Sequence, residues 1–97
     1  MRIDKLLWFL RFAASRSLAH DWVLDGHIRL NGRRVERASA AIKPGDILTL
    51  PLPRRVTVIE ILALPARRGP ATEAQACYRT LDDPAANPIA AAENNSP

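Results

Sequence analysis

Apolar and polar positions alternate at helical spacing at the start of the chain. The apolar stripe consists of Ile3, Leu6, Leu7, Leu10 and Ala14. These positions follow the i, i+3, i+4, i+7 rule and predict an amphipathic helix over residues 3–13. Phe9 and Phe12 lie off the stripe, so we expect this helix to be covered on more than one side. For Trp8 and Phe12 we expect packing rather than stacking on bases, because a chain this small needs large side chains to close its core.

A second amphipathic helix follows after a short break. Its apolar stripe consists of Leu18, Ala19, Trp22 and Val23, and its polar side of Arg16, His20, Asp21 and Asp25. Ser15 is the predicted N-cap, because its hydroxyl can accept a free backbone N–H. Gly26 is predicted to follow the helix in the left-handed conformation and to end it. The short break makes the two helices a tight pair.

Asn31-Gly32 is the strongest local signal in the chain. The dipeptide separates two short runs in which apolar and polar residues alternate. A type I′ turn needs positive φ at both central residues, which Asn and Gly tolerate, so the pattern predicts a tight β-hairpin. We expect Ile28 and Leu30 to face the core and Arg29 to point away from it.

The rest of the chain predicts two further strands and a short helix. Residues 38–41 form an irregular connector, and Pro44-Gly45-Asp46 predicts a turn. Strands are predicted over residues 47–50 and 56–64, the second being the longer and rich in β-branched residues. Thr72 as N-cap, with Gln75 three positions on, forms a capping-box pattern that predicts a helix over residues 73–81.

The combined pattern predicts an α+β fold, in which a helix pair packs on a small, mainly antiparallel sheet with an Asn-Gly hairpin and a short C-terminal helix. Three segments follow from it. Residues 1–65 form the domain and residues 66–83 a helical extension packed on it. Residues 84–97, rich in Pro, Ala and Asn, are predicted to be a disordered tail.

Composition excludes several function classes. The chain has 97 residues, enough for one domain, and its single Cys77 has no internal disulfide partner. One Cys and two His are too few for a structural zinc site, so no metal or other cofactor is expected. The N-terminus lacks a signal-peptide pattern, and the longest apolar run, residues 6–10, is far too short to span a membrane. We therefore expect a soluble, cytoplasmic monomer.

Positive charge is concentrated in the first half of the chain. Residues 1–55 contain eleven Lys or Arg against five Asp or Glu, whereas residues 56–97 contain three against five. Most of these basic residues accompany the two helices and the hairpin. A small protein with one cationic face is expected to bind a polyanion, and structured RNA is the expected partner in the cytosol. Arg54 and Arg55 match no motif, and we expect them to be simply solvated.

An ordered set of short motifs spans residues 1–50. Its members are Arg2-Ile3-Asp4-Lys5-Leu6-Leu7-Trp8, Arg11-Phe12, Ser15-Arg16, Ala19, Gly26-His27-Ile28, Leu30-Asn31-Gly32 and Pro44-Gly45-Asp46. This order resembles the RNA-binding domain of the ribosomal protein S-four type, also called the alpha-L motif. Within that family the chain is most similar to the ribosome-associated heat-shock protein fifteen group, through its start and through residues 67–68 and 70–74.

The resemblance implies both a function and a site. The function is binding to structured RNA, in this group ribosomal RNA of the large subunit, with a role in recycling stalled or dissociated large subunits under stress. The helical side of the site would comprise Arg2, Lys5, Arg11, Ser15 and Arg16, and the hairpin side Asn31, Gly32, Arg33, Arg34 and Arg37. Arginine suits this task because its planar guanidinium can donate two parallel hydrogen bonds to one phosphate. The helix N-terminus beside Ser15 and Arg16 also favours an anion.

Two other functions fit the sequence. The basic face can bind an acidic protein partner, or the domain can deliver RNA to the catalytic part of a larger RNA-modifying enzyme. No Gly-rich cofactor loop, nucleophile–base pair or metal-ligand cluster is visible in the residues, so no intrinsic enzymatic activity is expected. A helix-turn-helix DNA-binding role is less favoured, because the second helix exposes Asp21 and Asp25, which would repel phosphates.

Overall fold

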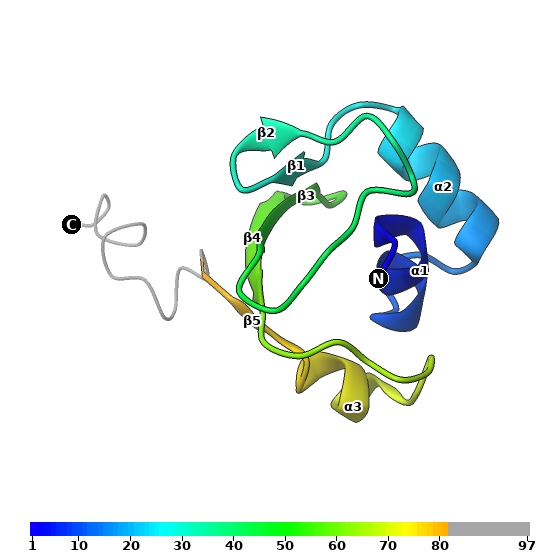
Figure 1. Ribbon diagram of the computed structural model, residues 1–97, viewed down its shortest axis with the longest axis vertical. Helices are drawn as coiled ribbons and strands as arrows, with labels where there is room; N and C mark the ends of the chain where they lie inside the picture. Colours follow the sequence, from blue (N-terminus) through cyan, green and yellow to red (C-terminus); the bar gives the residue numbers. More distant parts are fainter. Residues whose placement is uncertain (82–97) are drawn as a thin grey trace.

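Three helices and a five-stranded sheet make up the described part of the chain, residues 1–81 of a computed structural model (Figure 1). In chain order the elements are α1 (Ile3–Phe9), α2 (Arg16–Leu24), β1 (Arg29–Leu30), β2 (Arg33–Arg34), β3 (Ile47–Pro51), β4 (Val56–Ile61), α3 (Ala71–Gln75) and β5 (Tyr78–Thr80). The predicted α+β class is confirmed. The predicted tail, residues 84–97, lies outside the described residues.

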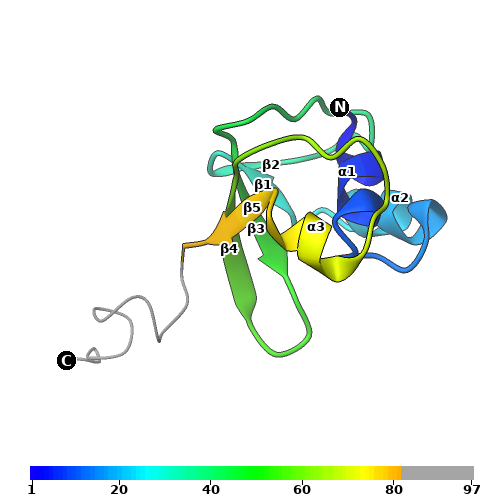
Figure 2. The same cartoon turned by 90° about the horizontal axis from the view of Figure 1, so that it is seen from below.

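The sheet is antiparallel throughout, with the strand order β2-β1-β3-β4-β5. Helices α1 and α2 pack against each other beside the sheet, and α3 lies near β5 (Figures 1 and 2). The fully buried side chains between helices and sheet include Ile3, Leu6, Leu7, Ile28, Leu48, Leu50, Ile59 and Ile61. One hydrophobic core therefore joins the first helix, the hairpin and the two long strands.

The first helix is shorter than the predicted span of residues 3–13, because the backbone of Arg11 turns left-handed. Arg11 has a φ of 68°, which a continuing α-helix does not allow. The N–H of Phe12 donates to the Leu7 carbonyl at 3.0 Å, and the N–H of Arg11 to the Trp8 carbonyl at 3.1 Å. This pair of bonds is a Schellman motif, with Arg11 in the position usually occupied by glycine. The helix therefore ends at Phe9.

The predicted start and end of the second helix are confirmed. The Ser15 hydroxyl accepts a hydrogen bond from the Leu18 N–H at 3.1 Å, and Gly26 follows the helix with a φ of 84°. The predicted burial of two apolar residues is wrong. Ala14 is exposed because the first helix has already ended, and Leu18 is 55% exposed because it lies in the first turn of α2, on the side away from the core.

The predicted hairpin is confirmed in its turn type. Asn31 and Gly32 have φ values of 52° and 85°, both positive as a type I′ turn requires. Leu30 pairs with Arg33 across the turn, and Leu30 also pairs with Leu48 of β3. The hairpin is thereby fixed to the central strands of the sheet, and its arginines project from a rigid support.

The predicted helix over residues 73–81 is wrong in its bounds and its cap. Helix α3 begins after Pro70, not Thr72, and no side chain caps it. Residues 78–80 form β5, which pairs antiparallel with the edge of β4 that β3 leaves open. The predicted capping box of Thr72 and Gln75 is therefore wrong, and the neighbouring Glu73 carboxylate accepts a hydrogen bond from Arg67 at 2.7 Å. The strand predicted over residues 56–64 also ends earlier, at Ile61.

The segment between β2 and β3 holds the chain's N-terminus against the hairpin side. The N–H of Ile3 donates to the Ala40 carbonyl at 2.8 Å, and the N–H of Ile42 donates to the Met1 carbonyl at 2.8 Å. An isolated bridge joins Arg2 to Ala41. These bonds fix the start of α1 beside residues 38–42, the connector between β2 and β3. They bring the basic residues near the N-terminus toward those that follow the hairpin.

Candidate nucleic-acid interface

A buried carboxylate organises the helical side of the predicted RNA surface. The Asp4 side chain is only 4% exposed, and its two oxygens accept hydrogen bonds from the Arg2 guanidinium at 3.2 Å each. Arg16 approaches the same carboxylate to 3.7 Å from the first turn of α2. The N–H of Lys5 donates to it at 2.7 Å. One carboxylate therefore orients two arginines that come from different helix ends.

The charge of Asp4 is stabilised by its surroundings. Burial alone would raise the pKa of this carboxyl, but the hydrogen bonds from Arg2 and the Lys5 N–H, with the charge of Arg16, outweigh burial and lower it below its ordinary value. Two guanidinium groups face one carboxylate, so the cluster keeps a net positive charge. The Arg2 and Arg16 side chains are 49% and 43% exposed, which leaves both accessible to an anion from solvent.

A shallow hollow of about 410 Å³ opens beside this cluster. Its lining includes Arg2, Asp4 and Arg16, with His20 and Asp21 of α2 on the far side. The N-terminus of α2 adds the partial positive charge of its free backbone N–H groups. The Ser15 hydroxyl already serves as the cap, so Ser15 contributes by fixing this helix end. The hollow has room for a phosphate group, and Arg2 and Arg16 give its lining positive charge.

The hairpin side is held by a second buried carboxylate. The Asn31 amide donates to Asp46 at 3.1 Å, and its oxygen accepts from the Ile47 N–H at 2.8 Å. Lys43 donates to Asp46 from its backbone N–H at 2.9 Å and from its ammonium at 3.0 Å. Burial alone would raise the pKa of Asp46, but these hydrogen bonds outweigh it and lower the pKa. The Asn31 side chain thus fastens the turn to β3.

Three arginines surround a second hollow, of about 620 Å³, beside the hairpin. Arg33, Arg34 and Arg37 line it, together with the apolar Leu30 and Val35. Glu36 is its acidic member. Arg34 also stands opposite Arg29 in the hairpin register, and like charges placed so are mutually repulsive unless an anion lies between them.

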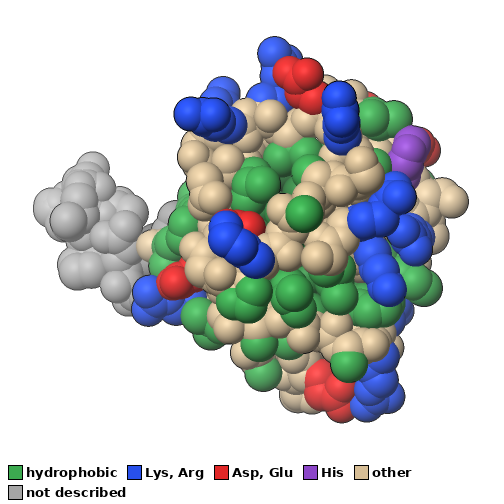
Figure 3. All heavy atoms as spheres, in the orientation of Figure 1, with side chains coloured by type: hydrophobic (Ala, Val, Ile, Leu, Met, Phe, Trp, Pro, Cys, Tyr) green, Lys and Arg blue, Asp and Glu red, His purple; other side chains and the backbone are tan. Residues whose placement is uncertain are grey.

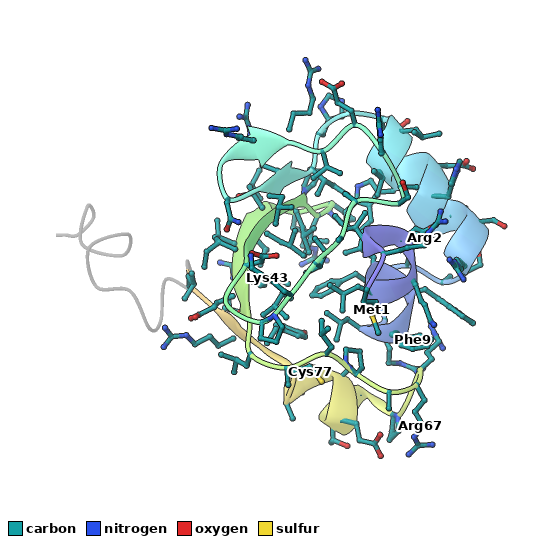
Figure 4. All side chains as sticks on the ribbon, viewed as in Figure 1. Met1, Arg2, Phe9, Lys43, Arg67 and Cys77 are labelled. Atoms are coloured by element: carbon teal, nitrogen blue, oxygen red, sulfur yellow. The ribbon has the colours of Figure 1, made fainter. Side chains whose placement is uncertain are left out.

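The basic residues form two groups joined across one side of the molecule. Figure 3 shows Lys and Arg side chains along the edge over the hairpin and again over α1 and α2, with the connector between them. Figure 4 places Arg2 where α1 and α2 meet. We call the predicted set the basic surface: Arg2, Lys5, Arg11, Ser15, Arg16, Asn31, Gly32, Arg33, Arg34 and Arg37.

Two members of the basic surface have partners elsewhere. The Lys5 ammonium lies 5.3 Å from the centre of the Phe9 ring. The Arg11 guanidinium donates to the Gly69 carbonyl at 2.9 Å, which ties the end of α1 to the C-terminal part of the chain. Neither side chain contacts the Asp4 carboxylate or lines the hairpin hollow, and Lys5 reaches Asp4 only through its backbone N–H. The structure therefore brings together Arg2 with Arg16, and Arg33 with Arg34 and Arg37.

Sequence reasoning missed three residues that shape this surface. Asp4 and Asp46 are buried and hold cationic partners, and their places in the sequence motifs do not predict this burial. Arg68 lies 6.0 Å from the centre of the Trp8 ring and donates to the Trp8 carbonyl at 3.0 Å. The available signal was the Arg2-Ile3-Asp4-Lys5 motif, in which an acid sits among basic residues. Helical periodicity alone places Asp4 off the apolar stripe.

Within residues 1–81, no group of three or more His, Cys, Asp or Glu is placed to hold a metal ion. None of the helices in this part of the chain is long and apolar enough to cross a membrane.

A helix pair, an Asn-Gly hairpin and two groups of arginines on an antiparallel sheet define a small RNA-binding domain. Residues 1–48 match the S4 domain family. The chain belongs to this family of RNA-binding domains. A solved relative that is 36% identical to it, and of which the chain covers 81%, also shows this membership.

The similar proteins are ribosomal and stress-related. A solved trimeric structure of heat shock protein 15 from Vibrio cholerae matches 84% of this chain with a TM-score of 0.79 and 36% identity. Small ribosomal subunit protein uS4 of Gloeobacter violaceus is 45% identical over 49 residues, which are 50% of this chain and 24% of the relative. The uS4 protein of Rubrobacter xylanophilus is 36% identical over 72 residues, 68% of this chain and 36% of the relative. The chain thus spans about a quarter to a third of the uS4 proteins it matches.

Proposed function

We propose that this protein binds structured RNA through the basic surface, gripping phosphates with Arg2 and Arg16 on one side and with Arg33, Arg34 and Arg37 on the other. The observation that carries the proposal is the shared Asp4 carboxylate. It holds two half-exposed arginines from different elements beside a hollow that has room for a phosphate group. Preoriented guanidinium groups lose less side-chain entropy when they bind phosphate than free ones do.

The shape of the surface suits the backbone of RNA rather than its bases. A-form RNA hides its base edges in a deep, narrow groove and is recognised mainly by its phosphates, its 2′-OH groups and its junctions. Such recognition needs donors on a rigid support. The Asn31 side chain and the connector supply that support, because they fasten the hairpin to β3 and the N-terminus of α1.

The proposed RNA is ribosomal, in the large subunit, and the proposed role is to recycle stalled or dissociated large subunits under stress. Similarity to heat shock protein 15 from Vibrio cholerae over most of both chains supports this reading more than the shorter similarity to uS4. We further propose that the protein is non-catalytic and cytoplasmic. The RNA-binding unit is the monomer, because both groups of arginines lie on one chain.

A salt titration tests the binding mode. If five or six basic residues neutralise phosphates, log K for a structured ribosomal RNA fragment falls with log salt at a slope of roughly −4 to −5. Arg16→Ala then reduces the slope by about one unit and weakens binding to every structured RNA by a similar factor. The matched control is Arg79→Ala, since Arg79 is ion-paired with Glu60 at 2.6 Å outside the basic surface.

Two outcomes contradict the proposal. Equal losses for Arg16→Ala and Arg79→Ala reduce the site to diffuse cationic attraction, and an affinity that does not change with salt removes the RNA function. An acidic protein partner is distinguished by nuclease treatment of a cell extract, which leaves such a complex intact. Sedimentation through a sucrose gradient reports whether the protein travels with free large subunits, with whole ribosomes or with neither. Sedimentation of the free protein also shows whether it is a monomer or a trimer, the form solved for the Vibrio cholerae relative.

A further inference from the structure

A third hollow, of about 510 Å³, shares no lining residue with the two hollows of the basic surface and lies next to the turn between β3 and β4. This turn projects beyond the helices (Figure 2). Phe12 and Tyr78, both half-buried, line the hollow and form a tilted aromatic pair whose ring centres are 5.1 Å apart. The side chains of Thr57, Ile59 and Thr80 complete this wall of the core.

Among the described residues, the charged side chains that line the hollows at the aromatic pair are all positive. Arg54 and Arg55 of the β3–β4 turn line the hollow, and its described lining contains no Asp or Glu. Phe12 and Tyr78 also line a neighbouring hollow of about 300 Å³, where Arg11 is the charged member. Among residues 1–81, neither Arg54 nor Arg55 takes part in an ion pair. Charge complementarity therefore selects an anionic occupant for an otherwise apolar and aromatic site.

We propose that this hollow takes one unpaired nucleotide of the bound RNA, with the base against Phe12 and Tyr78 and the adjacent phosphate at Arg54 and Arg55. A hollow of this size is in the usual range for a small ligand. Aromatic rings stack on any base, and flanking cations track the backbone, which is how single strands are bound without sequence preference. Thr57 and Thr80 add hydroxyl groups to the lining.

This proposal rests on the proposed RNA function and deepens it. The basic surface recognises the paired, phosphate-lined part of an RNA, and the aromatic hollow lies on another side of the same small domain. An RNA that engages both sites is one in which a duplex continues into an unpaired strand. The protein would then prefer a junction between paired and unpaired RNA over a blunt duplex.

Two RNA probes separate the sites: a blunt RNA hairpin, and the same hairpin with an unpaired adenosine extension. The full chain should bind the extended probe at least about fivefold more tightly, since stacking of one base on an aromatic ring is worth at least that factor. Tyr78→Leu and the double variant Arg54→Gln/Arg55→Gln should lose this preference and bind the blunt hairpin within about twofold of wild type. Tyr78→Phe keeps the ring and should keep the preference.

The controls keep the test independent of folding and of the proposed function. The amide resonances of Ile59 and Thr80 in the unaltered protein should shift when oligoadenylate is added, and unchanged resonances would overturn the proposal. So would an extended probe that binds no better than the blunt one, or a preference that survives Tyr78→Leu. If RNA-free protein self-associates and Tyr78→Leu is monomeric, the occupant is a second copy and not RNA. If the wild-type protein does not bind the blunt hairpin at all, the result contradicts the proposed RNA function and not the proposal for the aromatic hollow.

Discussion

The Asp4 carboxylate accepts two hydrogen bonds from the Arg2 guanidinium, both at 3.2 Å, inside an otherwise basic cluster. Arg16 reaches the same carboxylate at 3.7 Å. A bidentate pair fixes the plane of the guanidinium as well as its position. An acidic residue in the middle of an RNA surface therefore orders the cations around it, although its own charge opposes phosphate binding.

Asp4→Asn tests whether the orientation of Arg2 and Arg16 or the net charge of the protein matters more for RNA binding. The change removes a buried charge and weakens its hydrogen bonds, so the free energy of unfolding should fall by about 1–3 kcal/mol. It also makes the protein more positive by one unit. If Asp4 acts by orienting Arg2 and Arg16, affinity for structured RNA should fall despite the added positive charge. Urea unfolding and fluorescence anisotropy measure the two effects.

The matched control for this experiment is Asp21→Asn. Asp21 lines the same hollow, but its side chain is 75% exposed and its partner is His20 at 3.6 Å. This substitution changes the net charge equally without releasing either arginine. Asp21→Asn should raise RNA affinity slightly and leave stability within about 0.5 kcal/mol. A parallel rise for Asp4→Asn would mean that net charge, not orientation, governs binding.

Acid should destabilise the protein through the two buried carboxylates, Asp4 and Asp46. The folded-state pKa values of Asp4 and Asp46 are both lowered below the ordinary value of an aspartate. A lowered folded pKa stabilises the fold fully above the unfolded pKa, near 4, and this stabilisation is lost as the pH falls through the folded value. The free energy of unfolding should be flat in this respect above about pH 5 and decline below about pH 4. In Asp4→Asn and Asp46→Asn the decline should be shallower; an unchanged slope would contradict the assigned pKa shifts.

The parts of the fold that sequence predicted well are those fixed by neighbouring residues. Asn31-Gly32 can satisfy a turn with two positive φ angles by itself, and Ser15 caps a helix whose first turn lies directly after it. The hairpin and the second helix were accordingly predicted with the correct turn and cap. Because the cap and the turn were predicted correctly, the positions of Arg16 at the start of α2 and of the hairpin arginines after the turn were predicted correctly too.

The errors arose where distant partners decide the structure. Residues 78–80 have a pattern that suits a helix, but the open edge of β4 offers them a strand partner. Arg11 carries no glycine-like signal, yet it ends α1 with a positive φ and a hydrogen bond to Gly69, far along the chain. Burial of Asp4 depends on packing of α2 and the connector over α1. Helical periodicity holds no information on any of these contacts.

Gly32→Val should damage structure and binding together. A Cβ at this position meets no atom within 4 Å, so the cost is the positive φ of 85° and not a clash. A β-branched residue in that conformation costs of order 1–3 kcal/mol and would misplace Arg33 and Arg34. Gly32→Asn is the control, because Asn tolerates the left-handed region. Thermal unfolding and RNA titration should show a large effect for Val and a small one for Asn; equal effects would mean that the turn is not type I′.

Two substitutions at Arg11 separate its backbone role from its side-chain role. Both Arg11→Gly and Arg11→Ala remove the guanidinium and its 2.9 Å hydrogen bond to Gly69. Only glycine relieves the φ of 68° that ends α1, so Arg11→Gly should be more stable than Arg11→Ala by about 1 kcal/mol in urea unfolding. RNA affinity depends on the lost cation and should fall by the same factor in both. A reversed order of stability would show that a left-handed backbone at Arg11 does not fix the end of the helix, and an affinity that follows stability would remove Arg11 from the basic surface.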